Sequence, residues 1–293
     1  MSVASAARPR VELARAKVNL TLHVTGRRSD GYHLLDSLVV FPQIGDRISL
    51  QEASGLDLRI EGPFARDLHA PAGDNLVLKA ITSFSASARI PLPGLLVTLT
   101  KRLPVASGVG GGSSDAATTL RLLEDFTGTY LSEEELHALA LSLGADVPVC
   151  LVPEPQVMRG IGELISSGPE LPACGIVLVN PKVSVSTPDV FKALTSCDNA
   201  PMPLLPEGFD TLGQLAAYLE SCRNDLQAPA VGLEPQIGAV LSALQEDRRV
   251  EFARMSGSGA TCFGLCELAH AMEIERSLRE AHPQWWIASG PLA

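Results

Sequence analysis

The residues best suited to chemistry form a glycine-rich stretch, Ser107 to Asp115, which reads Ser-Gly-Val-Gly-Gly-Gly-Ser-Ser-Asp. Glycine permits positive φ and lets the backbone approach a ligand closely, because no Cβ intervenes. An apolar helical run follows, and the N–H groups and dipole of a helix start favour an anion. We therefore predict a phosphate cradle. A flexible surface linker is the alternative, but the run is short and is flanked closely by strand and helix patterns.

Two common phosphate-binding patterns do not fit this stretch. A P-loop requires Gly-Lys followed by Ser or Thr, and the sequence contains no Gly-Lys pair. The dinucleotide fingerprint requires a third glycine where this chain has Ser113, and it stands near the start of a βαβ unit. The stretch is therefore a less common kind of cradle, and a dehydrogenase is disfavoured.

Two charged residues stand in apolar surroundings. Asp146 lies between a glycine and a proline in Gly144–Pro148, where a turn or capping aspartate is an equally good explanation from the residues alone. Lys17 lies in the apolar run Ala-Lys-Val-Asn-Leu, where the alternative is a lysine whose ammonium group reaches out to solvent. Asn19, two residues further on, would share a strand face with Lys17.

Three motifs in order along the chain resemble those of the GHMP kinases, which include galactokinase and the homoserine, mevalonate and phosphomevalonate kinases. Pro104–Ala116 resembles the central motif, Ala16–Leu20 resembles the first, and Arg254–Thr261 resembles the third. The resemblance implies a two-domain α+β fold. Its N-terminal ATP-binding domain would resemble domain 2 of ribosomal protein S5, and its C-terminal domain would be a ferredoxin-like α/β plait. The active site would lie in the cleft between them.

A narrower resemblance comes from three further segments, Gly26–His33, Gly144–Pro148 and Asn224–Leu226. They are similar to the branch of the family that acts on a cytidine-diphosphate-linked methylerythritol in non-mevalonate isoprenoid biosynthesis. This implies an ATP-dependent kinase that phosphorylates the 2-hydroxyl by direct in-line transfer. Another GHMP kinase of homoserine or mevalonate type, or a non-catalytic nucleotide-binding module on the same fold, is the alternative.

The resemblance also implies roles for single residues. Asp146 would accept the proton of the attacking hydroxyl, and Lys17 would stand beside it to stabilise charge. Asn19 would hydrogen-bond the polyol of the substrate. Tyr32 and Phe191 would sandwich the cytosine ring, and His33 would read its hydrogen-bonding edge. Thr187 and Gly257 are further predicted substrate-binding residues. The alternative to base stacking for Phe191 is a place in the hydrophobic core.

The ATP contacts implied by the resemblance gather in and near the glycine stretch. They are Asn75, Lys101, Pro104, Val105, Ala106, Ser107, Gly108, Val109, Gly110, Gly111, Gly112, Ser113 and Ser114. We place Ser113 and Ser114 at the N-cap and first turn of the following helix. Mg²⁺ is expected with ATP, and Ser114 is its predicted protein contact.

The composition narrows the partners. A formal net charge of −10 disfavours a nucleic-acid partner, because polynucleotide binding depends on phosphate neutralisation by Lys and Arg. No apolar run approaches the roughly 18 residues of a membrane span. The six cysteines are scattered without metal-ligand spacing, so neither disulfides nor a zinc site is implied and a cytoplasmic location is predicted. We expect small-molecule partners only, and a monomer or weak homodimer.

Hydrophobic periodicity and turn residues predict an irregular mixture of strands and helices, which favours an α+β fold. The expected strands cover 11–24, 34–41, 46–52, 57–61, 95–99, 149–152, 176–179, 263–265 and 285–288. The expected helices cover 75–88, 116–123, 132–143, 188–194, 237–245 and 268–280. Pro153-Glu154-Pro155 marks the best domain boundary, giving a loose tail over 1–10 and domains over 11–154 and 155–293.

Overall fold

The computed structural model describes residues 9–68 and 75–292, so most of the predicted N-terminal tail lies outside the described residues. The chain divides into two compact units, and each draws on segments far apart in sequence. The first comprises Met1–Arg15, Gly45–Val105 and Gly111–Leu151, and the second comprises Ala16–Ile44, Ala106–Gly110 and Val152–Ala293. The domain boundaries expected at 11–154 and 155–293 stay a prediction.

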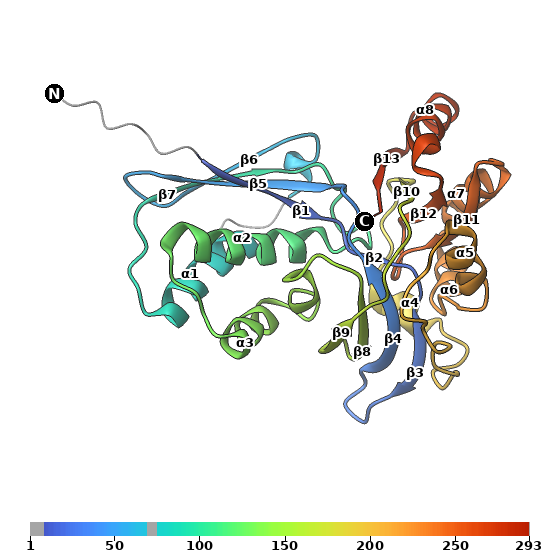
Figure 1. The fold of residues 1–293 in the computed structure, drawn as a ribbon, viewed down its shortest axis with the longest axis horizontal. Helices are drawn as coiled ribbons and strands as arrows, with labels where there is room; N and C mark the ends of the chain where they lie inside the picture. Colours follow the sequence, from blue (N-terminus) through green and yellow to red (C-terminus); the bar gives the residue numbers. More distant parts are fainter. Residues whose placement is uncertain (1–8, 69–74, 293) are drawn as a thin grey trace. The chain divides into compact units, whose positions relative to one another are not determined.

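Figure 1 labels the elements along the chain. The strands are β1 (Arg10–Arg15), β2 (Val18–Asn19), β3 (His23–Arg27), β4 (His33–Val40), β5 (Gly45–Glu52), β6 (Asp57–Glu61), β7 (Leu95–Thr100), β8 (Gln156–Gly160), β9 (Leu164–Ser167), β10 (Gly175–Asn180), β11 (Val250–Met255), β12 (Cys262–Cys266) and β13 (Trp286–Pro291). The α-helices are α1 (Leu76–Ala88), α2 (Gly111–Thr127), α3 (Glu133–Leu143), α4 (Thr187–Lys192), α5 (Leu212–Glu220), α6 (Gln227–Leu233), α7 (Gln236–Glu246) and α8 (Ala271–Ala281). Short 3₁₀ helices are η1 (Ala65–Asp67), η3 (Pro148–Cys150) and η4 (Leu268–His270).

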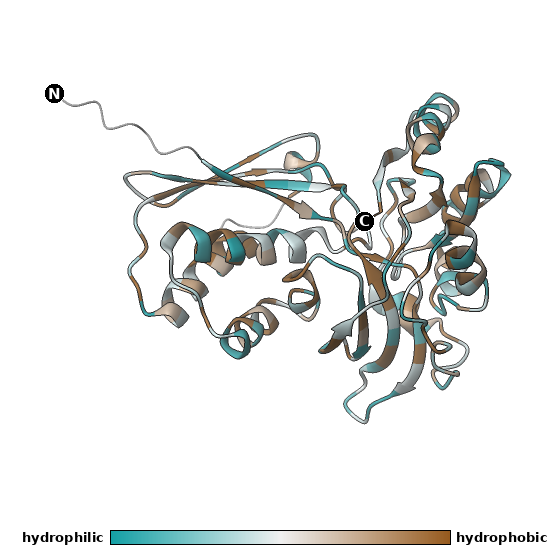
Figure 2. Cartoon of the chain, in the orientation of Figure 1, coloured by the Kyte–Doolittle hydropathy of each residue, from teal (hydrophilic) through white to brown (hydrophobic). Residues whose placement is uncertain are grey.

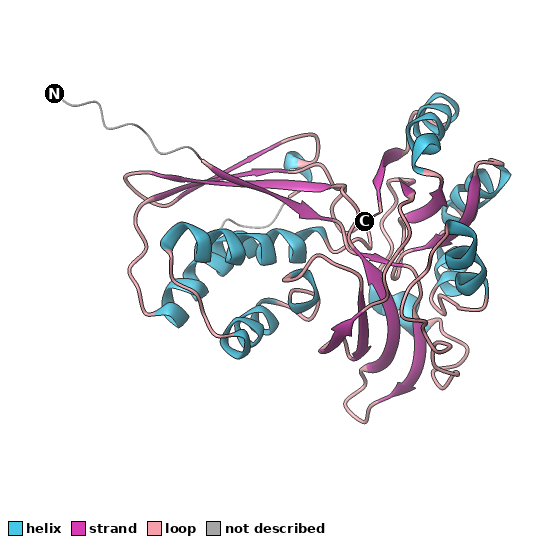
Figure 3. Ribbon diagram, viewed as in Figure 1, coloured by secondary structure: helices cyan, strands magenta, loops and turns pink. Residues whose placement is uncertain are grey.

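The first unit is a sheet covered by helices. Its strand order is β1-β5-β7-β6, antiparallel except for the parallel pair β6–β7. Leu95, Val97 and Leu99 of β7 alternate with less buried residues, as a sheet with one buried face requires. Helix α2 packs on β1 and β5, and α1 and α3 pack beside it. Figure 3 shows the strands and helices of this unit as separate layers, and Figure 2 shows both hydrophobic and hydrophilic residues on α1 and α2.

Two helix starts in this unit illustrate how local sequence sets the elements. Ser132 and Glu135 form the predicted capping box of α3, in which each side chain bonds the backbone N–H of the other. The strand expected over 149–152 is wrong, because the chain instead forms η3. Pro148 occupies the first turn of η3, where its fixed φ suits a helix and its missing N–H costs nothing.

The second unit contains two further sheets. One has the order β2-β4-β8-β9 with β3 also paired to β4, and the other has the antiparallel order β11-β12-β10-β13. Strands β8, β9 and β11 and helices α5 and α6 were not predicted. No strand was predicted over 156–160, so β8, which pairs with β4 from more than a hundred residues away in sequence, was missed.

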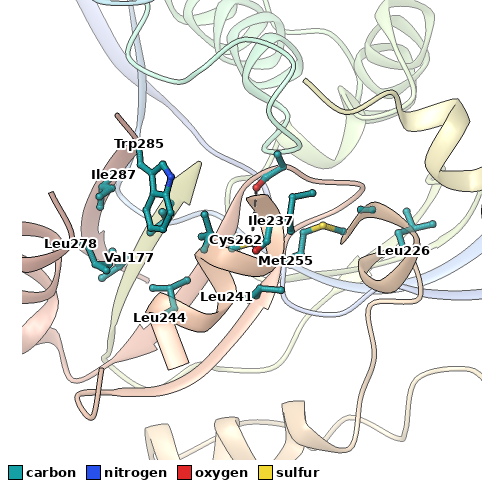
Figure 4. Close-up of a cluster of buried hydrophobic side chains, with 14 of the residues drawn as sticks. Val177, Leu226, Ile237, Leu241, Leu244, Met255, Cys262, Leu278, Trp285 and Ile287 are labelled. Atoms are coloured by element: carbon teal, nitrogen blue, oxygen red, sulfur yellow. Dashed lines mark hydrogen bonds between the residues drawn. The ribbon is translucent and has the colours of Figure 1, made fainter. Parts of the chain in front are cut away.

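Packing of α7 and α8 on the second sheet builds the core of this unit. Ile237, Leu241 and Leu244 on one face of α7 meet apolar residues of β10, β11 and β12 (Figure 4). Figure 4 also shows Trp285 over the same cluster. All six cysteines are free thiols, and Cys262 lies inside this core as a small apolar side chain. Within the described ranges, no helix is both long enough and apolar enough to cross a membrane.

His23 in β3 gives the second unit a pH-dependent stability. Its ring is buried, with Nδ1 3.2 Å from the carbonyl oxygen of Ala200 and Nε2 accepting the N–H of Arg223 at 3.0 Å. Burial lowers the pKa of His23 below its ordinary value, so folding favours the neutral ring. Its contribution to stability is therefore fully present above about pH 6.5 and is lost as pH falls through the lowered pKa.

We accordingly expect urea unfolding to show a stability that falls between pH 7 and pH 5, with a smaller fall in His23→Gln. His137→Gln, in α3 of the other unit, is the matched control and should retain the wild-type slope. An unchanged slope in His23→Gln would contradict this role for the buried ring.

Candidate active site

The glycine stretch adopts the backbone that its composition predicts. Ala106, Gly108 and Gly110 have φ of 52°, 79° and 61°, and α2 begins at the next residue, Gly111. The helix therefore begins two residues earlier than the predicted N-cap, and Ser113 and Ser114 lie inside its first turn. The first-turn amides of α2 have no helical partner and can bind an anion.

Residues of the second unit hold the first half of the stretch. The carbonyl oxygen of Ser107 accepts two bonds from Thr261, from its N–H at 3.2 Å and its hydroxyl at 2.6 Å. The carbonyl oxygen of Val109 accepts the N–H of Lys17 at 2.8 Å. A Cβ on Gly108 would lie 2.4 Å from the carbonyl oxygen of Gly259. The stretch is a fixed turn built against neighbouring backbone, which disfavours the flexible-linker alternative.

Gly108→Ala is expected to destabilise the protein by more than the roughly 1–3 kcal/mol of a strained left-handed residue, because its Cβ also meets backbone. Gly128 provides the control, since it has a φ of 67° but nothing within 4 Å of its Cβ position. Gly128→Ala should therefore show the conformational cost alone. The check is thermal unfolding together with KM for ATP, which should rise in Gly108→Ala only. Equal effects of the two substitutions would contradict the close packing of the turn.

Ser114 and Asn75 lie in the first unit. The Ser114 hydroxyl donates to the carbonyl oxygen of Arg15 at 2.5 Å, which leaves its oxygen lone pairs available to accept. Mg²⁺ binds oxygen ligands, so the hydroxyl oxygen of Ser114 is compatible with the predicted contact. Among residues 9–68 and 75–292, no three His, Cys, Asp or Glu side chains gather into a metal site. Asn75 is the N-cap of α1, and its side chain accepts the N–H of Val77 at 2.9 Å.

Lys101 lies in a buried ion cluster with two aspartates. Its ammonium group donates to Asp46 and, at 2.8 Å, to Asp115. Burial would lower the pKa of Lys101, but the two carboxylates outweigh it and raise that pKa. Burial raises the pKa of Asp115 to about 7, against the charge of Lys101, and the neighbouring Asp46 adds to the rise. The structure thus places Lys101 against protein carboxylates, and its predicted contact with ATP stays a prediction.

The two residues with predicted catalytic roles lie in different compact units. Lys17 follows β1 in the sequence, belongs to the second unit and is only 4% exposed as a residue. Asp146 is half-buried in a turn closed by the N–H of Val147 on the carbonyl oxygen of Gly144 at 3.0 Å. Pro148 then opens η3 directly behind it. Their joint role in one site stays a prediction.

Three of the residues predicted to contact the cytosine lie in one part of the second unit. The rings of His33 and Phe191 stack with centroids 4.7 Å apart and planes 20° apart. Nε2 of His33 lies 3.4 Å from Sγ of Cys197. Burial, and then the charge of Arg27, lowers the pKa of His33, which favours the neutral ring needed to read a base edge. Tyr32 is 61% exposed and available to a ligand.

Phe191 has two contacts that correspond to its two rival interpretations. It stacks on His33, and it also packs against the hydrophobic cluster of the second unit. Thr187, at the start of α4, has its hydroxyl 2.8 Å from that of Ser258. The structure therefore brings Thr187 next to the third motif, and it gives Phe191 a core role alongside any role in binding.

The third motif forms a turn held by asparagine. Gly257 has a φ of 57°, and a Cβ there would lie 3.5 Å from Oδ1 of Asn19. The backbone N–H of Asn19 donates to the Ser256 hydroxyl at 3.0 Å. Asn224 donates to the carbonyl oxygens of Met255 and Gly257 at 2.8 and 2.9 Å. Asn19 and Gly257 are thus neighbours, as two residues of one binding site must be.

Several residues that shape this region were not given a role from sequence. Asp46 and Asn224 fix the backbone near the glycine stretch and the Gly257 turn, and Arg254 donates from a buried position to three backbone carbonyl groups. Asn224 and Arg254 stand in motifs that resemble those of the family, and this position in a motif could have marked them as functional. Asp46 stands outside the motifs, and nothing local marks it.

Known proteins of one family match this sequence over nearly the whole chain. Residues 75–154 match the GHMP kinases N terminal domain, and residues 206–284 match the GHMP kinases C terminal domain. A 4-diphosphocytidyl-2-C-methyl-D-erythritol kinase of Ruegeria pomeroyi is 53% identical over 94% of this chain and 97% of its own length. The enzyme of the same name from Cereibacter sphaeroides is 50% identical over 96% and 98%.

Solved structures of kinases also match this chain. A crystal structure of 4-(cytidine 5'-diphospho)-2C-methyl-D-erythritol kinase superposes with a TM-score of 0.78 at 32% identity, covering 97% of this chain and 99% of the other. Homoserine kinase from Cytophaga hutchinsonii superposes with a TM-score of 0.68 at 17% identity over 99% and 96%, which shows the shared fold alone. The two-domain α+β fold expected from sequence is confirmed. The chain belongs to the GHMP kinases, in the family of 4-diphosphocytidyl-2-C-methyl-D-erythritol kinases.

Proposed function

We propose that this protein transfers the γ-phosphoryl group of ATP to the 2-hydroxyl of 4-diphosphocytidyl-2-C-methyl-D-erythritol, a step of non-mevalonate isoprenoid biosynthesis. The observation that carries the proposal is the 53% identity, over nearly the full length of both chains, to a protein of that name. The glycine turn at the start of α2 and the aromatic rings of the His33–Phe191 pair support the proposal, because helix-start amides suit a phosphate and aromatic rings suit a base.

In the proposed mechanism, Asp146 receives the proton of the substrate hydroxyl as its oxygen attacks the γ-phosphorus. The bond from that phosphorus to the β–γ bridging oxygen breaks in line, and ADP leaves. Lys17 stabilises the charge that develops on the transferring group. No covalent enzyme intermediate forms. Mg²⁺ would neutralise the triphosphate, and the hydroxyl oxygen of Ser114 would be its protein contact.

Asn19 and Gly257 would hold the polyol, with Thr187 nearby, and His33 would read the cytosine edge while Tyr32 and Phe191 stack on the ring. In the described structure one face of Phe191 already carries His33. Stacking of the base on Phe191 would therefore require the His33 ring to move, or the base to use the part of the Phe191 ring that His33 leaves uncovered. A cytoplasmic location and a monomer or weak homodimer complete the proposal.

Identification of the product tests this function. The purified protein is incubated with ATP, Mg²⁺ and the cytidyl alcohol, and phosphorus NMR locates the new phosphate. The expected product carries a monophosphate on the 2-hydroxyl and an intact diphosphate bridge. Phosphate on another hydroxyl would refute the assigned position. ATP binding without transfer to any alcohol would instead support a non-catalytic module.

A further inference from the structure

The buried cluster of Lys101, Asp46 and Asp115 has no role in the mechanism above. We propose that these residues form a positioning triad, which fixes the start of α2 and with it the amides of the glycine stretch. Lys101 then acts on ATP binding through the helix, without touching the nucleotide. The inference rests on the proposed binding of ATP at the glycine stretch.

The ammonium group of Lys101 forms ion pairs with two aspartates of the same chain. It donates to Oδ2 of Asp46 and, at 2.8 Å, to Oδ2 of Asp115. The side chain of Lys101 is 3% exposed, and those of Asp46 and Asp115 are 0% and 4% exposed. With two carboxylates around one ammonium group, the cluster offers no excess positive charge to a phosphate. A direct electrostatic contact with ATP is therefore disfavoured.

Asp46 connects the triad to the chain that enters the glycine stretch. Its Oδ1 accepts the backbone N–H groups of Arg102 and, at 2.8 Å, Leu103, while its Oδ2 accepts Lys101. Both oxygens of Asp46 are thus acceptors, and the residues they hold lie just before Pro104. Asp46 is the member of the triad that fixes the path from β7 into the stretch.

Asp115 connects the triad to α2. Gly111 and Asp115 are four residues apart, so they lie one above the other on the same face of the helix. A Cβ on Gly111 would be only 3.2 Å from Nζ of Lys101 and 3.5 Å from Oδ2 of Asp46. The first residue of α2 therefore rests directly on the triad. In the proposed triad, this close approach and the bond from Lys101 to Asp115 together fix the position and the rotation of the helix start.

The two aspartates differ in a way that makes the inference testable. Asp46 uses both oxygens as acceptors, whereas Oδ1 of Asp115 receives no hydrogen bond from the described residues. In Asp46→Asn, the new NH₂ group must face either the Lys101 ammonium group or two backbone N–H groups, so one side of the triad breaks. In Asp115→Asn, the NH₂ group takes the place of the unbonded oxygen, and Lys101 keeps its acceptor.

The experiment compares these two isosteric variants at pH 8.5, above the pKa of about 7 of Asp115, so that each substitution removes one negative charge. ATP affinity is measured by calorimetry without the alcohol, and KM for ATP and for the alcohol is measured in the full assay. We expect Asp46→Asn to weaken ATP binding about tenfold and Asp115→Asn to stay within about threefold of wild type, with the alcohol KM unchanged in both. Glu12→Gln is the control, because it removes an ion pair with Arg121 further along α2. It should leave ATP affinity unchanged.

Equal changes in the two variants would overturn the inference, because charge and not position would then govern binding. A loss of thermal stability in Asp46→Asn with unchanged ATP affinity would also overturn it, since the triad would be structural only. If Asp46→Asn does not fold, Asp115→Ala, which deletes an acceptor of Lys101, carries the same tenfold expectation. ATP affinity is measured without the alcohol. The comparison of the two variants therefore still tests the triad if the protein does not phosphorylate the proposed substrate.

Discussion

Asp146→Asn is expected to lower kcat by about 10²–10⁴-fold, because a positioned general base contributes a factor of that size. Asparagine has the shape of aspartate but cannot accept the hydroxyl proton. A backbone hydrogen bond closes the turn of Gly144–Val147, and asparagine keeps one acceptor oxygen in the same place, so the fold should persist. ATP affinity should therefore stay nearly unchanged while turnover falls. Steady-state kinetics and calorimetry on the same preparation separate the two quantities.

Asp125→Asn serves as the matched control for this substitution. Asp125 lies in α2 of the same unit and accepts a hydrogen bond from the exposed Tyr130 hydroxyl, so its loss should leave turnover near wild type. Turnover near the wild-type value in Asp146→Asn would remove Asp146 from the mechanism.

Lys17→Met is expected to lower kcat by about 10²–10³-fold, the cost of removing one preorganised group that stabilises transition-state charge. Lys17 is almost completely buried, and its backbone N–H bonds Val109 in the glycine stretch. Methionine preserves that backbone bond and most of the apolar stem. The lost quantity is therefore the positive charge, and it should appear in kcat more than in KM.

Lys182→Met controls for the loss of a lysine from the same unit, since Lys182 is exposed and lies outside the predicted site. It should keep full activity. If Lys17→Met raised KM for ATP with kcat unchanged, Lys17 would be a ground-state binding residue, and its place beside the base would be wrong.

Features that depend on neighbouring residues could be predicted from sequence. The glycine stretch requires positive φ at Gly108 and Gly110, and its glycine content states this directly. The capping box of α3 needs only Ser132 and Glu135. The family motifs added the assignment of family and fold, which the comparisons then confirmed.

Features that depend on residues far apart in sequence could not be predicted in this way. Asp46 and Lys101 are 55 positions apart, and only the pairing of β5 with β7 brings them together. Asn224 meets Gly257 because two loops of the second unit converge, and a single sequence does not record that contact. The β-rich composition of 149–152 suggested a strand, whereas Pro148 makes a helical turn more favourable.

Substrate choice tests the proposed function most directly, and it is measured by offering the wild-type protein three alcohols with ATP and Mg²⁺: the cytidyl methylerythritol, homoserine and mevalonate. The proposed function predicts that kcat/KM for the cytidyl alcohol exceeds the other two by on the order of 10³-fold or more, because a site built to hydrogen-bond a base rejects substrates that lack it. Phosphorylation of homoserine or mevalonate, with none of the cytidyl alcohol, would contradict the account.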